Sequence, residues 1–91
     1  MGEHIFMWYV YILQSQKTQN YFYKGSTNDL HRRLEEHAKG EVESSAPHRP
    51  YRLVYFEAYL YEKSARQRES SIKSSGAVWG ALMKRIKASL S

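Results

Sequence analysis

An apolar run near the N-terminus is the feature that most constrains how this chain can fold. Phe6 to Leu13 read FMWYVYIL, which is strand length and rich in aromatic and β-branched residues. Such a run is typical of a strand that is covered on both faces. Residues 1–5 precede it, and we expect them to form a loose tail.

The residues after this run predict a hairpin. Gln14–Asn20 are polar and read as the loop, and Tyr21–Lys24 read as a second strand that Gly25 ends. Because side chains alternate along a strand, Tyr23 and Lys24 should lie on opposite faces.

A helix should follow at once. Thr27, Asn28 and Asp29 are all suitable capping residues, the helix should continue to about Lys39, and Gly40 should stop it.

The inward face of this helix carries charge. Leu30, Leu34 and Ala38 define the expected buried arc, and Arg33 and His37 fall on or beside it, one turn apart. A guanidinium on the inward side of a small domain costs free energy unless it is paired or faces a wet cleft. This pattern is the first indication of a functional site. The residues expected to point away from the arc are Arg32, Glu35 and Glu36.

The second half of the chain predicts a third strand. Glu41–Pro50 read as a polar loop, and the strand should occupy Arg52–Ala58. A helix should then begin near residues 62–64 and end near Lys73.

Two helices therefore close the chain. In the first of them, Glu69 projects between the apolar markers Ala65 and Ile72. The second, Ala77–Leu90, has an apolar stripe at helical spacing.

Length and charge limit the function classes. Ninety-one residues make one domain, which we place at residues 6–90. The net charge of +5 and the pI near 9.6 favour a polyanionic partner such as nucleic acid, although a merely soluble basic protein has the same charge. The absence of cysteine excludes disulfides and thiolate chemistry, and no apolar run is long enough to span a membrane. We expect a cytoplasmic protein.

The ordered polar residues resemble the GIY-YIG nuclease family, in its small single-domain bacterial form. Tyr9-Val10-Tyr11 corresponds to the first family tripeptide and Tyr23-Lys24-Gly25 to the second. Arg33 and His37 match the arginine and the His or Tyr of the following helix, and Glu69 matches the metal-binding glutamate. The resemblance implies an α/β (α+β) fold with a small three-stranded antiparallel sheet flanked by three helices.

The same resemblance implies hydrolysis of DNA phosphodiester bonds, including those of branched or damaged DNA, with one Mg²⁺ or Mn²⁺. Glu69 would hold the ion, and Arg33 would bind phosphate oxygens. Tyr11 and Tyr23 would position the attacking water. Either a tyrosine or His37 would take its proton, and the sequence leaves that choice open.

Each of these residues also has an ordinary structural explanation. Tyr11 and Tyr23 could be sheet core with bonded hydroxyls, and His37 could pack at a helix edge. Arg33 and Glu69 could form an ion pair that ties two helices together.

Two further functions compete with the nuclease. One is a non-catalytic nucleic-acid-binding module, for which a protein partner would supply targeting. The other is a protein-interaction module that uses Trp79, Leu82 and Ile86 of the last helix. The basic residues expected to contact nucleic acid are Lys24, Lys39, His48, Arg49, Arg52 and Lys73.

Overall fold

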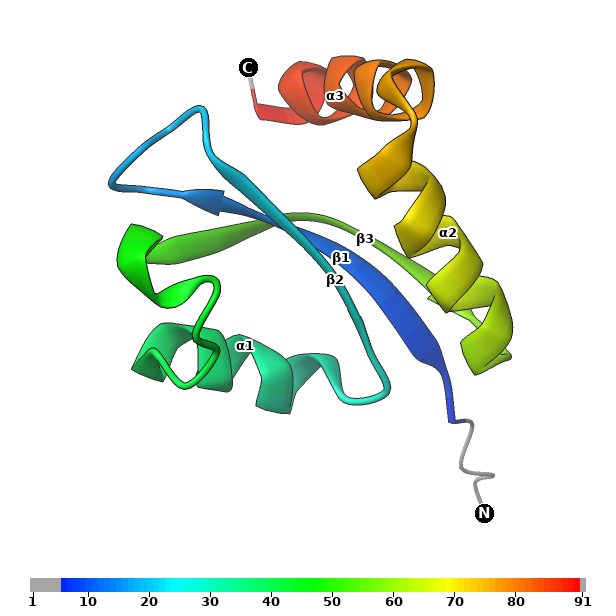
Figure 1. The fold of residues 1–91 in the computed structure, drawn as a ribbon, viewed down its shortest axis with the longest axis horizontal. Coiled ribbons are helices and arrows are strands. Elements are labelled where there is room, and N and C mark those ends of the chain that lie inside the picture. The colour runs from blue at the N-terminus through cyan, green and yellow to red at the C-terminus, as the bar shows by residue number, and fades with distance from the viewer. Residues whose placement is uncertain (1–5, 91) are drawn as a thin grey trace.

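The structure, a computed structural model that describes residues 6–90, is a three-stranded antiparallel sheet with three helices. The expected N-terminal tail lies outside the described residues. The sheet has the order β2-β1-β3, so the central strand is the apolar run near the N-terminus. The helix α1 covers one face of the sheet, and α2 and α3 cover the other (Figure 1). The elements are β1 Trp8–Ser15, β2 Phe22–Thr27, α1 Leu30–Lys39, β3 Tyr51–Tyr59, α2 Glu62–Ser74 and α3 Gly76–Leu90, with a 3₁₀ turn at Ala46–His48.

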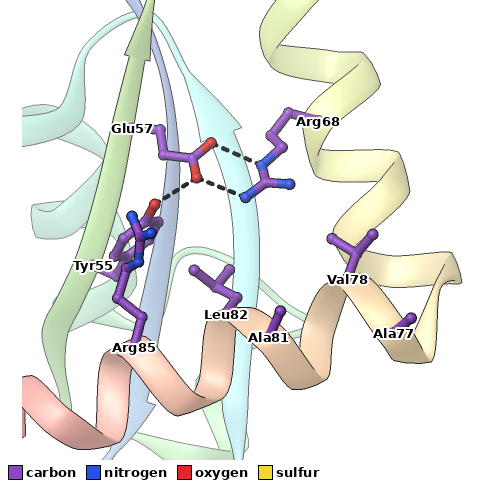
Figure 2. Close-up of a pocket in the computed structure, with 8 residues that line it drawn as sticks. All are labelled: Tyr55, Glu57, Arg68, Ala77, Val78, Ala81, Leu82 and Arg85. Carbon is purple, nitrogen blue, oxygen red and sulfur yellow. Dashed lines mark hydrogen bonds and ion pairs between the residues drawn. The ribbon is translucent and has the colours of Figure 1, made fainter.

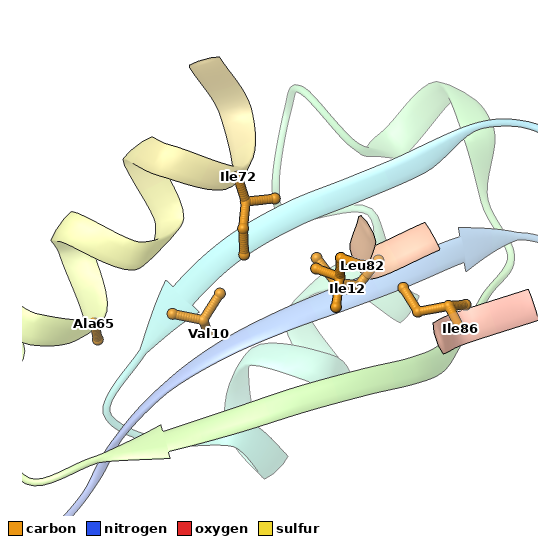
Figure 3. Packing of buried hydrophobic residues seen from close by; sticks show 6 residues of the cluster. All are labelled: Val10, Ile12, Ala65, Ile72, Leu82 and Ile86. Atoms are coloured by element: carbon orange, nitrogen blue, oxygen red, sulfur yellow. The ribbon is translucent and has the colours of Figure 1, made fainter. Parts of the chain in front are cut away.

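The apolar core lies between the sheet and the helices α2 and α3. Alternate residues of β1 point to this side, and the last helix supplies its apolar stripe to the same cluster (Figure 3). The prediction of a strand covered on both faces is therefore confirmed. The buried members are Val10, Ile12, Ala65, Ile72, Leu82 and Ile86.

Helix α1 begins and ends where the capping residues predicted. The Asp29 side chain accepts a hydrogen bond from the Arg32 N–H, and Gly40 ends the helix in the left-handed conformation with φ 78°. The predicted buried arc is partly wrong, because Ala38 is exposed and His37 is the buried residue of this helix. The imidazole can occupy the interior because both of its nitrogens are hydrogen-bonded.

The prediction that Gly25 ends the second strand is also wrong. Strand β2 continues to Thr27, and Gly25 pairs with Tyr11 of β1 inside the ladder. The remaining strand and helix boundaries differ from the predicted ones by a residue or two, as is usual for element ends.

Candidate active site at the edge of strand β2

A buried chain of hydrogen bonds joins β1 to α1. The Tyr11 hydroxyl lies 2.7 Å from His37 Nε2, and His37 Nδ1 lies 2.7 Å from Ser45 Oγ. Because the Ser45 hydroxyl donates to the Val42 carbonyl, it accepts from Nδ1–H, which leaves Nε2 to accept from Tyr11. Tyr11 and Ser45 are fully buried and His37 is 1% exposed. The imidazole is thus held in one tautomer and cannot contact solvent directly.

Burial keeps both ends of the Tyr11–His37 pair neutral. It lowers the pKa of His37 to about 4, and the positive charge of Arg33 acts in the same direction. Burial also raises the pKa of Tyr11, although the interaction with the Arg33 side chain partly opposes that rise. At neutral pH the pair is therefore an uncharged hydroxyl donating to an uncharged imidazole.

Gly25 is required because of the position of the Tyr11 ring. A Cβ atom on Gly25 would lie 2.6 Å from the Tyr11 hydroxyl oxygen and 2.8 Å from Cζ. Any side chain would therefore push Tyr11 away from His37. The family glycine of the second tripeptide thus serves close packing here, rather than the turn that the sequence suggested.

Tyr23 is the more accessible of the two tyrosines. Its ring centroid lies 4.7 Å from that of His37 and 6.3 Å from that of Tyr11. The residue is half-buried, and within residues 6–90 its hydroxyl makes no hydrogen bond. Tyr23 therefore offers the hydroxyl that a water molecule or a substrate could reach.

Arg33 carries its charge beside these rings. Its Nη1 lies 2.9 Å from Glu36 Oε1, and this bond is the main reason that the pKa of Arg33 is raised. Glu36, which was expected to point away from the buried arc, pairs with Arg33 and holds its guanidinium in place. The side chain of Arg33 is 34% exposed, so part of its charge faces solvent.

Glu69 approaches the same strand from α2. The Ser26 hydroxyl donates to Glu69 Oε1 over 2.5 Å, and Lys73 Nζ lies 2.7 Å from Oε2. The negative charge of Glu69 contributes to the raised pKa of Tyr11, so the carboxylate is within electrostatic reach of the tyrosine. Glu69 and Arg33 have separate partners, and the structure records no ion pair between them.

These residues lie around β2, on both faces of the sheet. Tyr11 lies over Gly25 on the α1 side, whereas Ser26 holds Glu69 on the α2 side. Because β2 is an edge strand, the partly exposed Tyr23 and Glu69 can border its solvent-facing edge, whereas Tyr11 and His37 are buried. We call this arrangement the β2 site, and its members are Tyr11, Tyr23, Arg33, His37 and Glu69.

The donor atoms around Glu69 fit a hard divalent cation. They are a carboxylate and the Ser26 hydroxyl, and Mg²⁺ prefers oxygen ligands while keeping several waters. No cluster of three or more His, Cys, Asp or Glu residues occurs in the described part of the chain, so substrate oxygens and water would complete the coordination. Lys73 Nζ lies 2.7 Å from Oε2, so a metal ion held by Glu69 would compete with this ammonium.

Two of the six basic residues predicted to contact nucleic acid lie near Glu69. Lys73 pairs with it directly. Lys24 Nζ lies 4.1 Å above the Trp79 ring, and burial together with the charge of Lys73 lowers its pKa.

The other four basic residues lie elsewhere. His48 stacks on Tyr21 with a centroid separation of 3.8 Å, and Arg52 donates to the Gln14 side chain. Arg49 donates to the Ala46 carbonyl. Lys39 is exposed in the last turn of α1.

Neither of the two serines that hydrogen-bond to site residues, Ser26 and Ser45, was predicted from the sequence. Ser26 was missed because the strand was predicted to end at Gly25; since β2 continues to Thr27, strand alternation places Ser26 on the same face as Lys24. Ser45 gives no such signal, since it lies in the irregular 41–50 segment.

A second polar network, which was not predicted from the sequence, lies on the opposite edge strand. Glu57 of β3 accepts two hydrogen bonds from Arg68 and one from the Tyr55 hydroxyl (Figure 2). The Tyr59 hydroxyl donates a fourth, which saturates both oxygens of Glu57. Burial would raise the pKa of Glu57, but these donors outweigh it and hold the pKa at about 2. An open pocket of about 420 Å³ adjoins this network and is lined by residues of β3, α2 and α3.

Comparison with known proteins identifies the family. Residues 7–78 match the GIY-YIG catalytic domain. The UPF0213 protein HQ_3675A of Haloquadratum walsbyi is 37% identical over 67 residues, which cover 72% of this chain and 73% of that protein. The solution NMR structure of the UPF0213 protein BH0048 from Bacillus halodurans matches with a TM-score of 0.53 and 31% identity, and the match covers 86% of this chain and 83% of that one. With its strand order, its two tyrosines and its helical arginine and histidine, the chain belongs to the GIY-YIG family.

Proposed function

We propose that this protein is a metal-dependent endonuclease that hydrolyses phosphodiester bonds in DNA. The main support is the arrangement at the edge of β2, where the guanidinium of Arg33, the unbonded hydroxyl of Tyr23 and the carboxylate of Glu69 border one strand. These three groups supply a phosphate ligand, a water ligand and a metal ligand.

Arg33 would bind the scissile phosphate. A guanidinium stays charged at any working pH and forms paired hydrogen bonds to phosphate oxygens, so it stabilises the charge that builds up as the phosphorus is attacked. Glu36 restrains the guanidinium and fixes its direction.

The two tyrosines would have different roles. Tyr23 can contact the attacking water, because its hydroxyl has no other partner in residues 6–90. Tyr11 is fully buried and donates to His37, so it would fix the position of the imidazole and, through it, that of the neighbouring Tyr23 ring. We therefore assign His37 a positioning role through Tyr11, not direct contact with water.

Glu69 would hold one Mg²⁺ or Mn²⁺ together with a substrate phosphate oxygen. The bound ion would neutralise phosphate charge and favour departure of the leaving oxygen. The Ser26 hydroxyl would orient the carboxylate for this task.

The test is cleavage of single-stranded, duplex and branched DNA with Mg²⁺ or Mn²⁺. Arg33→Ala and Glu69→Ala should each reduce the rate by about 100-fold or more, as expected for loss of a charge-stabilising group. Arg32→Ala is the matched control, because Arg32 is the neighbouring arginine and is exposed on the same helix. Cleavage that persists in both site variants would contradict the proposal.

One observation favours a non-catalytic nucleic-acid-binding module as the second candidate. Lys73 already neutralises Glu69, and a protein that binds DNA without a metal would keep that pair. This candidate predicts DNA binding that weakens steeply with salt and no cleavage under any metal condition.

Two of the three side chains on which the third candidate, a protein-interaction surface on α3, was based are not available to a partner. Leu82 is 4% exposed and Ile86 is fully buried, because both pack against the protein's own sheet. No described helix is long and apolar enough to cross a membrane.

A further inference from the structure

A groove lies beside the β2 site, between the end of α3 and the loop that joins β1 to β2. Its volume is about 450 Å³. Met83 and Leu90 of α3 contribute apolar surface to it. We call it the Trp79 groove, and its other lining residues are Gln14, Gln19, Asn20, Phe22, Trp79 and Lys87.

The chemistry of the groove suits a nucleobase. Trp79 and Phe22 both line the groove and meet edge to face with centroids 5.7 Å apart, and aromatic side chains are the groups on which bases stack. The side-chain amides of Gln19 and Asn20 make no hydrogen bond within the described residues, so they can pair with the polar edge of a base. An aromatic surface beside free amides can hold both the ring face and the base edge.

A row of cations connects the groove to Glu69. Lys24 lies over the Trp79 ring at 4.1 Å, and it is close enough to Lys73 for the two charges to interact. Lys73 in turn lies 2.7 Å from Glu69. A strand whose base occupies the groove would therefore have its phosphates directed along lysines toward the β2 site.

We propose that the Trp79 groove binds an unpaired base of the substrate DNA. Bases inside a duplex are stacked and paired, so their faces and edges are not available to the groove. This inference rests on the proposed nuclease function and deepens it.

The charge of the groove favours DNA over an apolar peptide. Lys87 lines the groove and Lys24 lies on the Trp79 ring, and none of the lining residues is acidic. A polyanion with stackable rings matches both the charge and the aromatic surface.

The two tryptophans of the chain provide the test. In a Trp8→Phe variant, Trp79 is the sole fluorescent indole, and it should be quenched by a thymidine oligonucleotide of about eight nucleotides without metal. An abasic oligomer of equal length and charge should bind about tenfold more weakly and cause little quenching, because stacking on an aromatic side chain is lost.

The matched control is Trp79→Phe, in which Trp8 is the sole indole. Trp8 lies on β1 near Arg66 of α2 and does not line the groove, so neither oligomer should quench it. Equal affinity and equal quenching for thymidine and abasic oligomers would overturn the proposal, as would quenching of Trp8 that matches that of Trp79.

A second variant tests substrate choice. Trp79→Ala should weaken binding of the thymidine oligonucleotide by about tenfold and leave the affinity for blunt duplex unchanged. If this variant does not fold, the comparison of the two oligomers on Trp8→Phe still decides the question. If the groove fails these tests while cleavage still depends on Arg33 and Glu69, only this inference is refuted. If quenching occurs but no DNA is cleaved, the proposed function is refuted and the groove stands.

Discussion

Two glutamates on the same side of the sheet differ in how many of their acceptor sites are already occupied by the protein's own donors. Glu57 and Glu69 have almost equal exposure, with side chains 16% and 17% accessible. Glu57 accepts four hydrogen bonds, two of them from one guanidinium, whereas Glu69 accepts one from a serine hydroxyl and one from a half-exposed lysine. The two glutamates therefore do not differ in burial, but they differ in the number and strength of the hydrogen-bond donors that contact them.

The difference extends to the two edges of the sheet. At the β3 edge, the bidentate Arg68 leaves no acceptor on Glu57 for a ligand (Figure 2). At the β2 edge, Tyr23 and part of Glu69 and Arg33 remain available. We therefore expect the β3 network to serve stability and the β2 site to serve the proposed chemistry, and this division can be tested.

The largest effect is expected at Gly25. Gly25→Ala places a Cβ against the Tyr11 ring and should destabilise the protein by about 3 kcal/mol. Gly80→Ala is the control, since its Cβ would meet nothing within 4 Å and an alanine in a helix interior should stabilise by about 0.5 to 1 kcal/mol. Denaturant unfolding measures both values, and a neutral effect of Gly25→Ala would show that Tyr11 is not packed as described.

His37 in the β2 site and Glu57 in the β3 network should also contribute to the free energy of unfolding in different pH ranges. The pKa of His37 is lowered to about 4 in the folded protein, so as pH falls the imidazole is protonated in the unfolded chain before it is protonated in the folded one. The free energy of unfolding should therefore decrease between about pH 6.5 and pH 4, by up to about 3 kcal/mol. The pKa of Glu57 is lowered to about 2, so its contribution is present above about pH 4.5 and is lost between there and pH 2.

Unfolding free energies measured across pH would separate these windows. His37→Gln should flatten the profile between pH 6.5 and 4 and leave the lower window unchanged. An unchanged slope in the upper window would mean that another group is responsible for it.

Removing the β3 guanidinium should have an intermediate effect. Arg68→Ala leaves Glu57 charged and largely buried, and should cost about 2 kcal/mol of unfolding free energy. Arg66→Ala, two positions earlier on α2, breaks the exposed pair with Glu62 and should cost less than about 1 kcal/mol. Equal costs would mean that the network at Glu57 is no stronger than a surface ion pair.

The smallest effect concerns the metal. Lys73→Ala removes the cation that competes for Glu69 and should strengthen Mn²⁺ binding without DNA by about two- to fivefold, which is the range of a surface ion pair. Lys63→Ala, an exposed lysine at the start of the same helix, should leave the affinity unchanged. Calorimetric titration gives both affinities, and no gain at Lys73 would argue against a metal on Glu69.

The parts of the fold that depend on local signals were predictable. Asp29 and Gly40 fixed the ends of α1, and helical spacing placed Glu69 between the buried Ala65 and Ile72. Contacts that depend on the pairing of distant segments were not predictable. The packing of Gly25 against Tyr11 depends on the register in which β1 pairs with β2, and that register could not be predicted from the sequence.

The polar partners were the least predictable part. Ser45 reaches His37 from an irregular segment with no periodicity. The convergence of Tyr55, Tyr59 and Arg68 on Glu57 requires knowledge of how α2 lies across the sheet, which alternation along β3 cannot supply.

The most direct measurement compares Glu69→Gln with Glu57→Gln, for DNA cleavage and for thermal stability. Glu69→Gln should reduce cleavage by about 100-fold or more and keep the unfolding free energy within about 0.5 kcal/mol of the original. Glu57→Gln should cost about 2 kcal/mol of stability and, well below its melting temperature, cleave DNA at the original rate. The account would be contradicted if both folded variants lost cleavage equally, or if Glu69→Gln cleaved DNA normally.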